Sequence, residues 1–318
     1  MNAFHIYYQK ERDIPKFDLI NLLVQVASIK FWKKNQGPIH LYCNENHLES
    51  LKLWGIDKLY DSINLNCLQD IPYSEHLEKY WSFCKIHAIK KISENHKEFV
   101  VLDTDLWIQE PINIDNKFQF IGYHEEDVID DLKNPYLHPE TFLKSTESSL
   151  IDWSMNPINC AFLYLNSSHL VDEWYKWVLR TIELNKNEPI FNLSADTIFI
   201  EQRLLSAIAY TLKMKVGKLI PNIYLPHITS DHLGSEWEPK IGFNLENQYL
   251  TWNIKHVWGL KKSYKEPEIR NMVISTVISS LDTFIEDWRN SCEDLIYQID
   301  KIQVKTLKEL EQTLQTEK

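Results

Sequence analysis

The chain has 318 residues, of which 44% are hydrophobic and 25% charged, as in a globular protein with a sizeable core. Its formal net charge of −11 disfavours broad contact with a phosphate backbone, so we expect no nucleic-acid partner. Only 7 glycines occur, and neither GxGxxG nor GxxxxGK[ST] is present, which excludes the common Gly-rich phosphate loops.

Cysteine usage and hydropathy favour a cytoplasmic protein. No run approaches the ~18 consecutive apolar residues of a membrane-spanning helix. The first residues lack the basic flank and the apolar length of a signal peptide. The cysteines are dispersed without a CxxC pair, which is typical of reduced, buried thiols: Cys43, Cys67, Cys84, Cys160 and Cys292.

Strand-type and helix-type apolar patterns alternate along most of the chain. Strands that alternate with helices form βαβ units, so we predict an α/β fold with a mostly parallel central sheet flanked by helices. Residues 125–157 are acidic and contain three prolines, and we interpret them as a loop with short helices. In chain order we predict a strand at 4–8, a helix at 18–34, strands at 38–43 and 58–65 around a helix at 49–56, a helix at 79–93, strands beginning at 98, 118 and 158, helices at 168–184 and 194–212, and a strand at 215–221.

The chain changes character near residue 266. Apolar residues recur in a 4-3-4-3 spacing between 281 and 302, which is a heptad-like stripe. We therefore predict a catalytic domain over 1–265 and a C-terminal helical extension over 266–318. The extension either packs on that domain or joins copies of the chain into a homo-oligomer.

Two carboxylates follow an apolar run in the sequence FVVLDTDLWI, residues 99–108. If the strand ends at Leu102, Asp103 and Asp105 emerge together at its carboxyl end, where open α/β sheets bind ligands. A buried carboxylate is costly unless it is paired or binds a metal, and these oxygens suit Mg²⁺ or Mn²⁺. The alternative is a solvated turn that carries two acids.

An apolar strand followed by Asp-x-Asp resembles the DxD motif of nucleotide-sugar glycosyltransferases with the GT-A fold. Together with three later stretches, it resembles glycosyltransferase family 8, the group of glycogenin and the bacterial lipo-oligosaccharide galactosyltransferases. The sequence departs from that family at Ala161, where the family has Gly, and at Glu201, where it has Asp. The later stretches are NCAFLYLN from Asn159, IEQRLLS with Glu201 and Gln202, and HVWGLKK with His256, Gly259 and Lys262.

The resemblance implies a Rossmann-like GT-A fold and metal-dependent transfer of a sugar with retention of configuration. The donor would be a nucleotide-diphosphate sugar, with UDP expected, and the acceptor a glycan, a lipid-linked glycan or another hydroxyl compound. Mn²⁺ or Mg²⁺ would be the cofactor. The implied site residues are Asp103, Asp105 and His256 for the metal, Asp103, Lys85, Gly259 and Lys262 for the donor, and Glu201, Gln202 and Asn159 for catalysis at the sugar.

Ordinary structural roles stay open for several of these residues. His256 can be a packed side chain beside Trp258, Glu201 a helix-surface acid, and Asn159 a turn residue. The pair Lys261–Lys262 can be solvated. The aromatic side chains that could stack on sugar rings can equally lie in the core: Trp153, Trp174, Trp237, Trp252 and Trp258.

Two other functions also stay open. A haloacid-dehalogenase phosphatase likewise has an apolar strand followed by Asp-x-Asp, but it requires Thr or Val where this chain has Trp107, and it places the motif near the N-terminus. The other alternative is a non-catalytic GT-A-like binding or scaffold protein that works through its C-terminal heptads.

Overall fold

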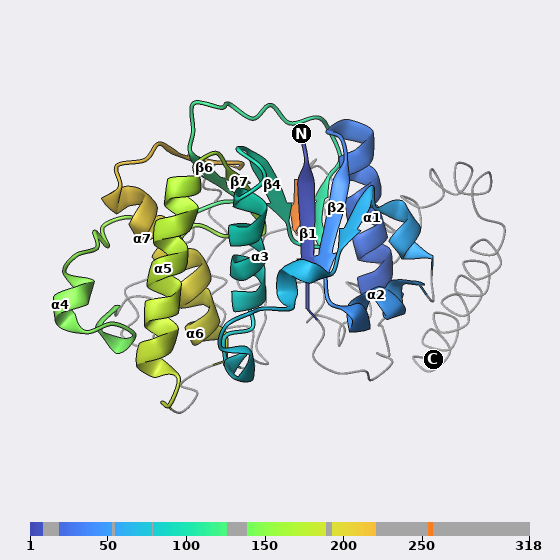
Figure 1. The fold of residues 1–318 in the computed structure, drawn as a ribbon. Helices are drawn as coiled ribbons and strands as arrows, with labels where there is room; N and C mark the ends of the chain where they lie inside the picture. The colour runs from blue at the N-terminus through green and yellow to red at the C-terminus, as the bar shows by residue number, and fades with distance from the viewer. Residues whose placement is uncertain are drawn as a thin grey trace, which may run out of the picture.

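The computed structural model describes residues 1–8, 19–52, 55–77, 79–125, 139–188, 193–220 and 254–256, without the side chains of 19–23, 193–195 and 255–256. Within these residues a seven-stranded sheet has the order β3-β2-β1-β4-β7-β6-β8, and β5 pairs separately with β9 (Figure 1). The strands are β1 Ala3–Tyr7, β2 Ile39–Cys43, β3 Ser62–Asn64, β4 Phe99–Leu102, β5 Leu106–Ile108, β6 Phe120–Gly122, β7 Phe162–Leu165, β8 Val216–Lys218 and β9 Ile254–His256. The helices are α1 Leu19–Asn35, α2 Glu45–Lys52, α3 Phe83–Ser93, α4 Ser145–Ser148, α5 Ser168–Asn185, α6 Leu193–Ile198 and α7 Leu204–Thr211.

The predicted α/β class with a mostly parallel sheet is confirmed. β1 pairs in parallel with β2 and β4, β2 with β3, and β6 with β8. Only β7 runs against the others within this sheet, because it is antiparallel to both β4 and β6. The amino-terminal end of β7 therefore lies at the edge where β4 ends.

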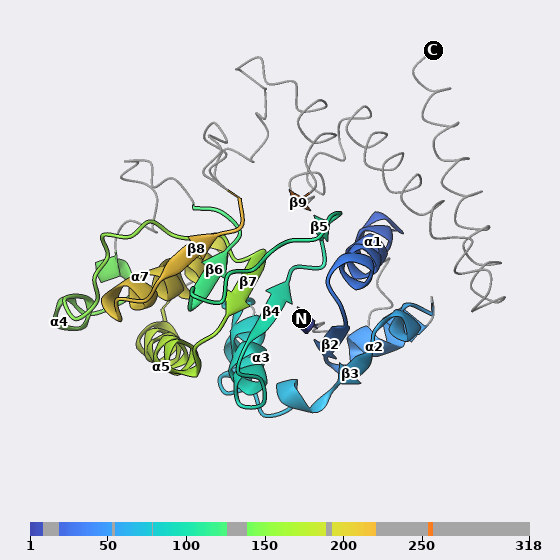
Figure 2. The same cartoon turned by 90° about the horizontal axis from the view of Figure 1, so that it is seen from above.

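Helices cover both faces of the sheet, and the sheet divides the core in two (Figure 2). α1 lies on one face, and α3 and α5 lie on the other. β4 is buried on both faces, and its side chains alternate between the two cores: Val100 and Leu102 join the α1 side, and Phe99 and Val101 the α3 side. A strand buried on both faces reads as a continuous apolar run, which explains the sequence FVVL.

The helix boundaries differ from the sequence-based ones where other contacts prevail. α2 lies earlier than the predicted 49–56, and Gly55 just beyond it adopts a left-handed conformation with φ 66°, which does not continue a helix. α3 begins at Phe83 instead of 79, because the backbone amide of Ser82 bonds to Thr197 of α6 instead of to a carbonyl of its own helix. Lys255 and His256 belong to β9, a strand that the sequence-based prediction does not include.

Of the remaining predicted features, only some fall within the described residues. The described part of 125–157 contains only the 3₁₀ turn Pro139–Thr141 and the short α4, as expected. Four of the five cysteines are described, and these are buried outside any disulfide. The helical extension over 266–318 and its boundary lie outside the described residues.

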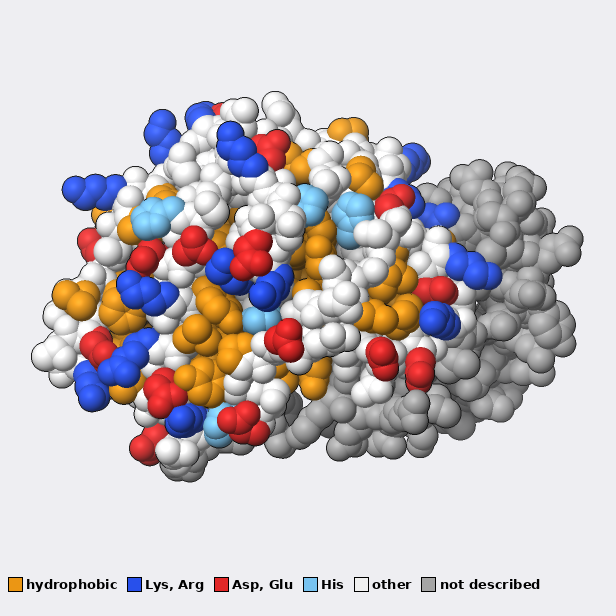
Figure 3. All heavy atoms as spheres, in the orientation of Figure 1, with side chains coloured by type: hydrophobic (Ala, Val, Ile, Leu, Met, Phe, Trp, Pro, Cys, Tyr) orange, Lys and Arg blue, Asp and Glu red, His pale blue; other side chains and the backbone are white. Residues whose placement is uncertain are grey.

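The described helices and surface add two observations. Within the described ranges, each helix is too short or too polar to cross a membrane. On the face shown in Figure 3, acidic and basic side chains are interspersed among the described residues, with apolar side chains between them.

Candidate functional site

The two acids lie in a tight turn between β4 and β5. The amide of Asp103 donates to the carbonyl of Ala161 at 2.8 Å, and the amide of Leu106 donates back to the carbonyl of Asp103 at 3.0 Å. The side chain of Asp103 is 36% exposed, whereas Asp105 is 4% exposed. A solvated turn with two exposed acids is therefore wrong, because the turn buries one carboxylate and presents the other.

Neutral hydrogen bonds from α1 hold β5 directly after this turn. Ser28 Oγ donates to the carbonyl of Leu106 at 2.6 Å, and Asn35 Nδ2 donates to the carbonyl of Ile108 at 3.0 Å. The indole of Trp107 donates in return to the carbonyl of Val24 at 2.9 Å. These bonds leave the backbone of the acid turn little freedom on its α1 side.

A relay of side chains stands behind the bond to Leu106. Gln25 Nε2 donates to the Tyr60 hydroxyl at 2.8 Å, and that hydroxyl lies 2.8 Å from Nδ1 of His5. Nε2 of His5 lies 3.2 Å from the Ser28 hydroxyl. One hydrogen assignment satisfies every step: Tyr60 donates to Nδ1, and Nε2–H of His5 donates to Ser28, which donates to Leu106.

The imidazole of His5 is neutral in this relay. Burial lowers its pKa to about 3, and the neighbouring charge of Asp105 offsets only part of that shift. Sequence reasoning missed His5. The available signal was a histidine inside FHIYY, an otherwise apolar and aromatic strand at the start of the chain.

A charged cluster holds the other side of the turn. Lys85, in the first turn of α3, donates to Asp103 Oδ1 at 2.6 Å and to the carbonyl of Cys160 at 2.8 Å. Its ammonium also lies 2.8 Å from Glu201 Oε1. Lys85 thus links the end of β4, the residues just before β7 and the helix that carries Glu201. Lys85 was predicted to bind the donor, and in the structure it already contacts two carboxylates.

The cluster contains one cation for two carboxylates. Burial lowers the pKa of the Lys85 ammonium, but the charges of Asp103 and Glu201 outweigh burial, so its net pKa is raised. Burial raises the pKa of the Glu201 carboxyl against the opposing effect of Lys85, and Asp103 raises it further. With both acids ionised, the cluster carries one uncompensated negative charge at the sheet edge.

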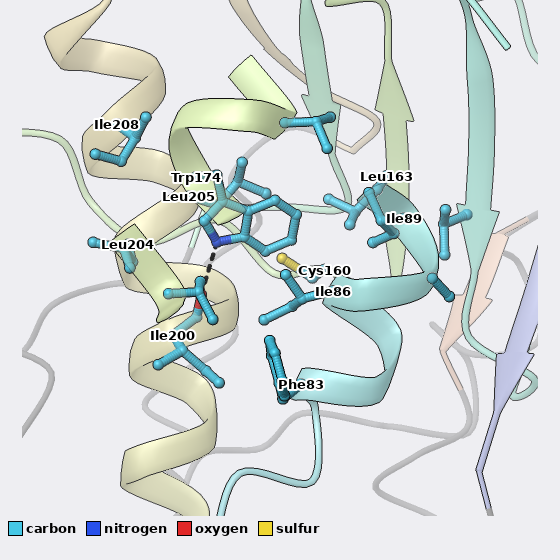
Figure 4. Packing of buried hydrophobic residues seen from close by; sticks show 14 of the residues in the cluster. Phe83, Ile86, Ile89, Cys160, Leu163, Trp174, Ile200, Leu204, Leu205 and Ile208 are labelled. Carbon is cyan, nitrogen blue, oxygen red and sulfur yellow. Dashed lines mark hydrogen bonds between the residues drawn. The ribbon is translucent and has the colours of Figure 1, made fainter. Parts of the chain in front are cut away.

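Glu201 and Gln202 lie in a π-helix, Phe199–Arg203, between α6 and α7. The predicted helix at 194–212 is therefore present, but it widens by one residue per turn at the candidate residues. The indole of Trp174 from α5 donates to the carbonyl of Ile200 at 2.8 Å inside this segment (Figure 4). Such widened turns are frequent at functional sites. Glu201 is 5% exposed, so it is not the helix-surface acid of the alternative interpretation.

Asn159 reaches the same edge because β7 is antiparallel. Its Oδ1 accepts from the amide of Ala161 at 2.9 Å, so it does act as a turn residue. Its backbone is bonded to Tyr123 and His124, just after β6. The backbone of β6 at Gly122 lies very close to this turn: a Cβ on Gly122 would lie 1.9 Å from Cγ2 of Ile158 and 3.2 Å from the carbonyl oxygen of Asn159.

β9 brings the backbone of His256 to the acid turn. β9 pairs antiparallel with β5, and His256 stands opposite Leu106, the residue after Asp105. The side chain of His256, together with Gly259 and Lys262, lies outside the described residues. Among the side chains that are described, no three His, Cys, Asp or Glu groups form a metal-binding cluster. Carboxylate oxygens are ligands that Mg²⁺ and Mn²⁺ prefer in proteins, and this turn carries two carboxylates.

The fold and site define an α/β protein with an acidic site at the carboxyl edge of its sheet. No family model matches the chain, and no curated protein matches it in sequence. Among solved structures, it is similar to galactosyltransferase LgtC in complex with donor and acceptor sugar analogues, at TM-score 0.37 and 13% identity over 69% of this chain and 73% of that one.

Mouse xyloside xylosyltransferase 1, in its apo form, is also similar, at TM-score 0.39 and 13% identity over 73% of this chain and 92% of that one. Likenesses at this level assign no activity to this chain. The function has to be argued from the chain's own residues.

Proposed function

We propose that the protein is a metal-dependent glycosyltransferase. It takes a sugar from a nucleotide diphosphate, UDP by the sequence resemblance, and transfers it with retention to a hydroxyl of a glycan or lipid-linked acceptor. The observation that carries the proposal is convergence: Asp103, Lys85 and Glu201 meet at one sheet edge, although they come from three distant parts of the chain.

Asp103, Asp105 and His256 would hold the divalent cation, Mn²⁺ or Mg²⁺, which neutralises the charge that grows on a departing diphosphate. Support for this ligand set comes from the shared turn of the two acids and from the pairing of His256 with Leu106. In the resemblance, Lys262 and Gly259 contact the same diphosphate.

The chain's own charges suit the sugar side of the reaction. Lys85 fixes one oxygen of Asp103 and one of Glu201, so both carboxylates are oriented before substrate arrives. When it is ionised, the Glu201 carboxylate favours the positive charge that develops at the anomeric carbon. Gln202 on the π-helix and Asn159 in the adjoining turn would orient the sugar hydroxyls.

The Lys85 ammonium explains why Glu201, in place of the Asp of the family, need not abolish this chemistry. Glu201 has one more methylene than Asp, and its longer side chain starts from a widened helical turn. Lys85 compensates by bonding Glu201 directly. The pair keeps a carboxylate at the edge of the site despite the substitution.

A panel of nucleotide sugars incubated with Mn²⁺ tests the proposal. We expect the wild type to release nucleoside diphosphate from one donor, and Asp105→Ala to lose that release. Asp61→Asn is the matched control, because Asp61 is an ion-paired acid just before β3, at the opposite edge of the sheet.

The alternatives give different results in the same panel. Release of inorganic phosphate from sugar phosphates, without any nucleoside diphosphate, would point to a phosphatase. Metal-dependent donor binding without turnover in either form would point to a binding protein.

A further inference from the structure

Trp81 stands out on the surface near the candidate site. It is 57% exposed, and the other exposed large apolar residues among those described are Met1, Tyr7, Leu150 and Tyr210. Exposing a large aromatic side chain leaves its apolar area in water, which costs free energy. A functional contact would recover that area.

The neighbours of Trp81 hold its backbone in place. Tyr80 and Ser82 are both 1% exposed, and Phe83 is fully buried. Lys79 is 6% exposed and donates to the carbonyls of Asn185 and Glu188 at 2.9 and 3.1 Å, near the end of α5. An exposed tryptophan between fixed, buried neighbours is not the tip of a loose loop, and its rigidity limits the entropy lost on binding.

Trp81 also lies close in the chain to the charged cluster, two residues before the start of α3 at Phe83. Ser82 is bonded to Thr197 of α6 through its amide at 3.2 Å and its hydroxyl at 3.1 Å, so the start of α3 and α6 lie side by side (Figure 1). Lys85 follows Trp81 by four residues, and Glu201 follows Thr197 by four. Four residues of chain span at most about 14 Å, so Trp81 and Lys85 lie within the length of a short oligosaccharide.

We propose that Trp81 is the platform on which the acceptor sugar stacks. The apolar C–H face of a pyranose fits the flat indole, and the proposed function places the donor sugar at the Lys85–Glu201 pair, four residues along the chain. A single large aromatic side chain fits one sugar ring, whereas protein-docking surfaces are contiguous patches. This inference rests on the proposed function and adds the acceptor class, a glycan with a pyranose terminus.

The contrast with other aromatic residues supports this assignment. Trp174, considered as a sugar contact from sequence, is fully buried in the core and bonded to Ile200. Trp153 packs against Phe199 with ring centroids 5.8 Å apart. Tyr210 is 46% exposed, but it lies in the last turns of α7, which lead to the start of β8 at the opposite sheet edge.

The test measures disaccharide binding by saturation-transfer NMR with UDP and Mn²⁺ present. The probes are lactose, maltose and cellobiose, and the proteins are wild type, Trp81→Phe, Trp81→Ala and Tyr210→Ala. We expect at least one disaccharide to bind the wild type and Tyr210→Ala equally. Trp81→Ala should weaken that binding about tenfold or more, and Trp81→Phe should fall between.

Equal disaccharide binding by Trp81→Ala and wild type would overturn the inference, and so would the absence of disaccharide binding in the wild type. UDP binding in the same samples separates the two claims. If UDP and Mn²⁺ bind the wild type but the Trp81 variants do not discriminate, only the platform fails. If UDP does not bind the wild type, the proposed function fails. Trp81→Phe keeps a planar ring. If Trp81→Ala fails to fold, the comparison of disaccharide binding by Trp81→Phe and wild type still tests the inference.

Discussion

The two sides of the acid turn are held by opposite kinds of interaction. On the α1 side, neutral groups pass hydrogen bonds from Gln25 through Tyr60, His5 and Ser28 to the carbonyl of Leu106. On the α3 side, an ammonium is shared between the carboxylates of Asp103 and Glu201. The neutral side fixes the backbone of the turn, and the charged side sets its electrostatics.

This difference separates positioning from chemistry. Neutral buried hydrogen bonds hold a geometry without adding charge, so salt affects them little. A buried charged pair depends on both partners, because removal of one leaves the other uncompensated in a poorly solvated place. The α1 side should therefore respond to loss of single hydrogen bonds, and the α3 side to loss of charge balance.

The largest effect should follow removal of the shared cation. Lys85→Met leaves Glu201 buried without its partner, and we expect the free energy of unfolding to fall by about 3–5 kcal/mol. Urea denaturation at pH 7 measures this. Adding Glu201→Gln to Lys85→Met should recover part of the loss, since the buried carboxylate is then gone. A loss under about 1 kcal/mol in Lys85→Met, or no recovery in the double variant, would contradict the charged-cluster account.

On the neutral side, Ser28→Ala should cost less. It removes the hydroxyl between His5 and the Leu106 carbonyl, and we expect a loss of about 1–3 kcal/mol. This loss in the free energy of unfolding should be the same at about 50 mM and about 500 mM NaCl, because neutral hydrogen bonds are not screened by salt. A loss that shrinks strongly with added salt would show that the relay carries charge.

The pH dependence of stability tests whether His5 is neutral. The pKa of His5 is about 3 in the folded protein and about 6.5 when unfolded, so the unfolded chain binds more protons between these values. Stability should therefore be lost as pH falls below about 6.5, by up to about 1.4 kcal/mol per pH unit from this histidine.

His5→Gln should flatten that slope while lowering stability at pH 7, because the relay is interrupted. His47, whose pKa burial also lowers to about 3, supplies a second contribution that stays in the variant. An unchanged slope in His5→Gln would mean that His5 does not titrate as the relay requires.

The smallest effect on stability should come from an ion pair that contacts neither side of the acid turn. Lys33 and Asp61 are 2.8 Å apart, but their side chains are 36% and 34% exposed. We expect Lys33→Met to change the free energy of unfolding by no more than about 1 kcal/mol. This variant is the control for Lys85→Met, and a comparable loss in both would remove the distinction between them.

The sequence predicted those features of the fold and site that depend on residues adjacent in the chain. An apolar run that ends in two acids marks a buried strand followed by a turn, and the structure has β4 followed by that turn. Lys85 was predicted as a donor contact only through the family resemblance, and in the structure its ammonium lies 2.6 Å from Asp103 Oδ1. The burial of Asp105 beside an exposed Asp103 was not visible, because it depends on how α1 holds β5.

Other features depended on distant partners. Periodicity does not give strand direction, so the antiparallel β7, which brings the carbonyl of Cys160 to Lys85, could not be predicted. A π-helix has the apolar pattern of an ordinary helix, so the widened turn at Glu201 was missed. α3 lost its predicted first turn because Ser82 bonds Thr197, a contact between residues far apart in sequence.

Calorimetric titration of UDP in the presence of Mn²⁺ tests the central claim most directly. The proteins are wild type, Asp103→Asn, Asp105→Asn and the control Asp61→Asn. We expect Mn²⁺-dependent binding in wild type and Asp61→Asn, weakened about tenfold or more in both acid-turn variants. UDP binding that needs no Mn²⁺, or that is equal in all four proteins, would mean that the acid turn does not hold a donor through a metal.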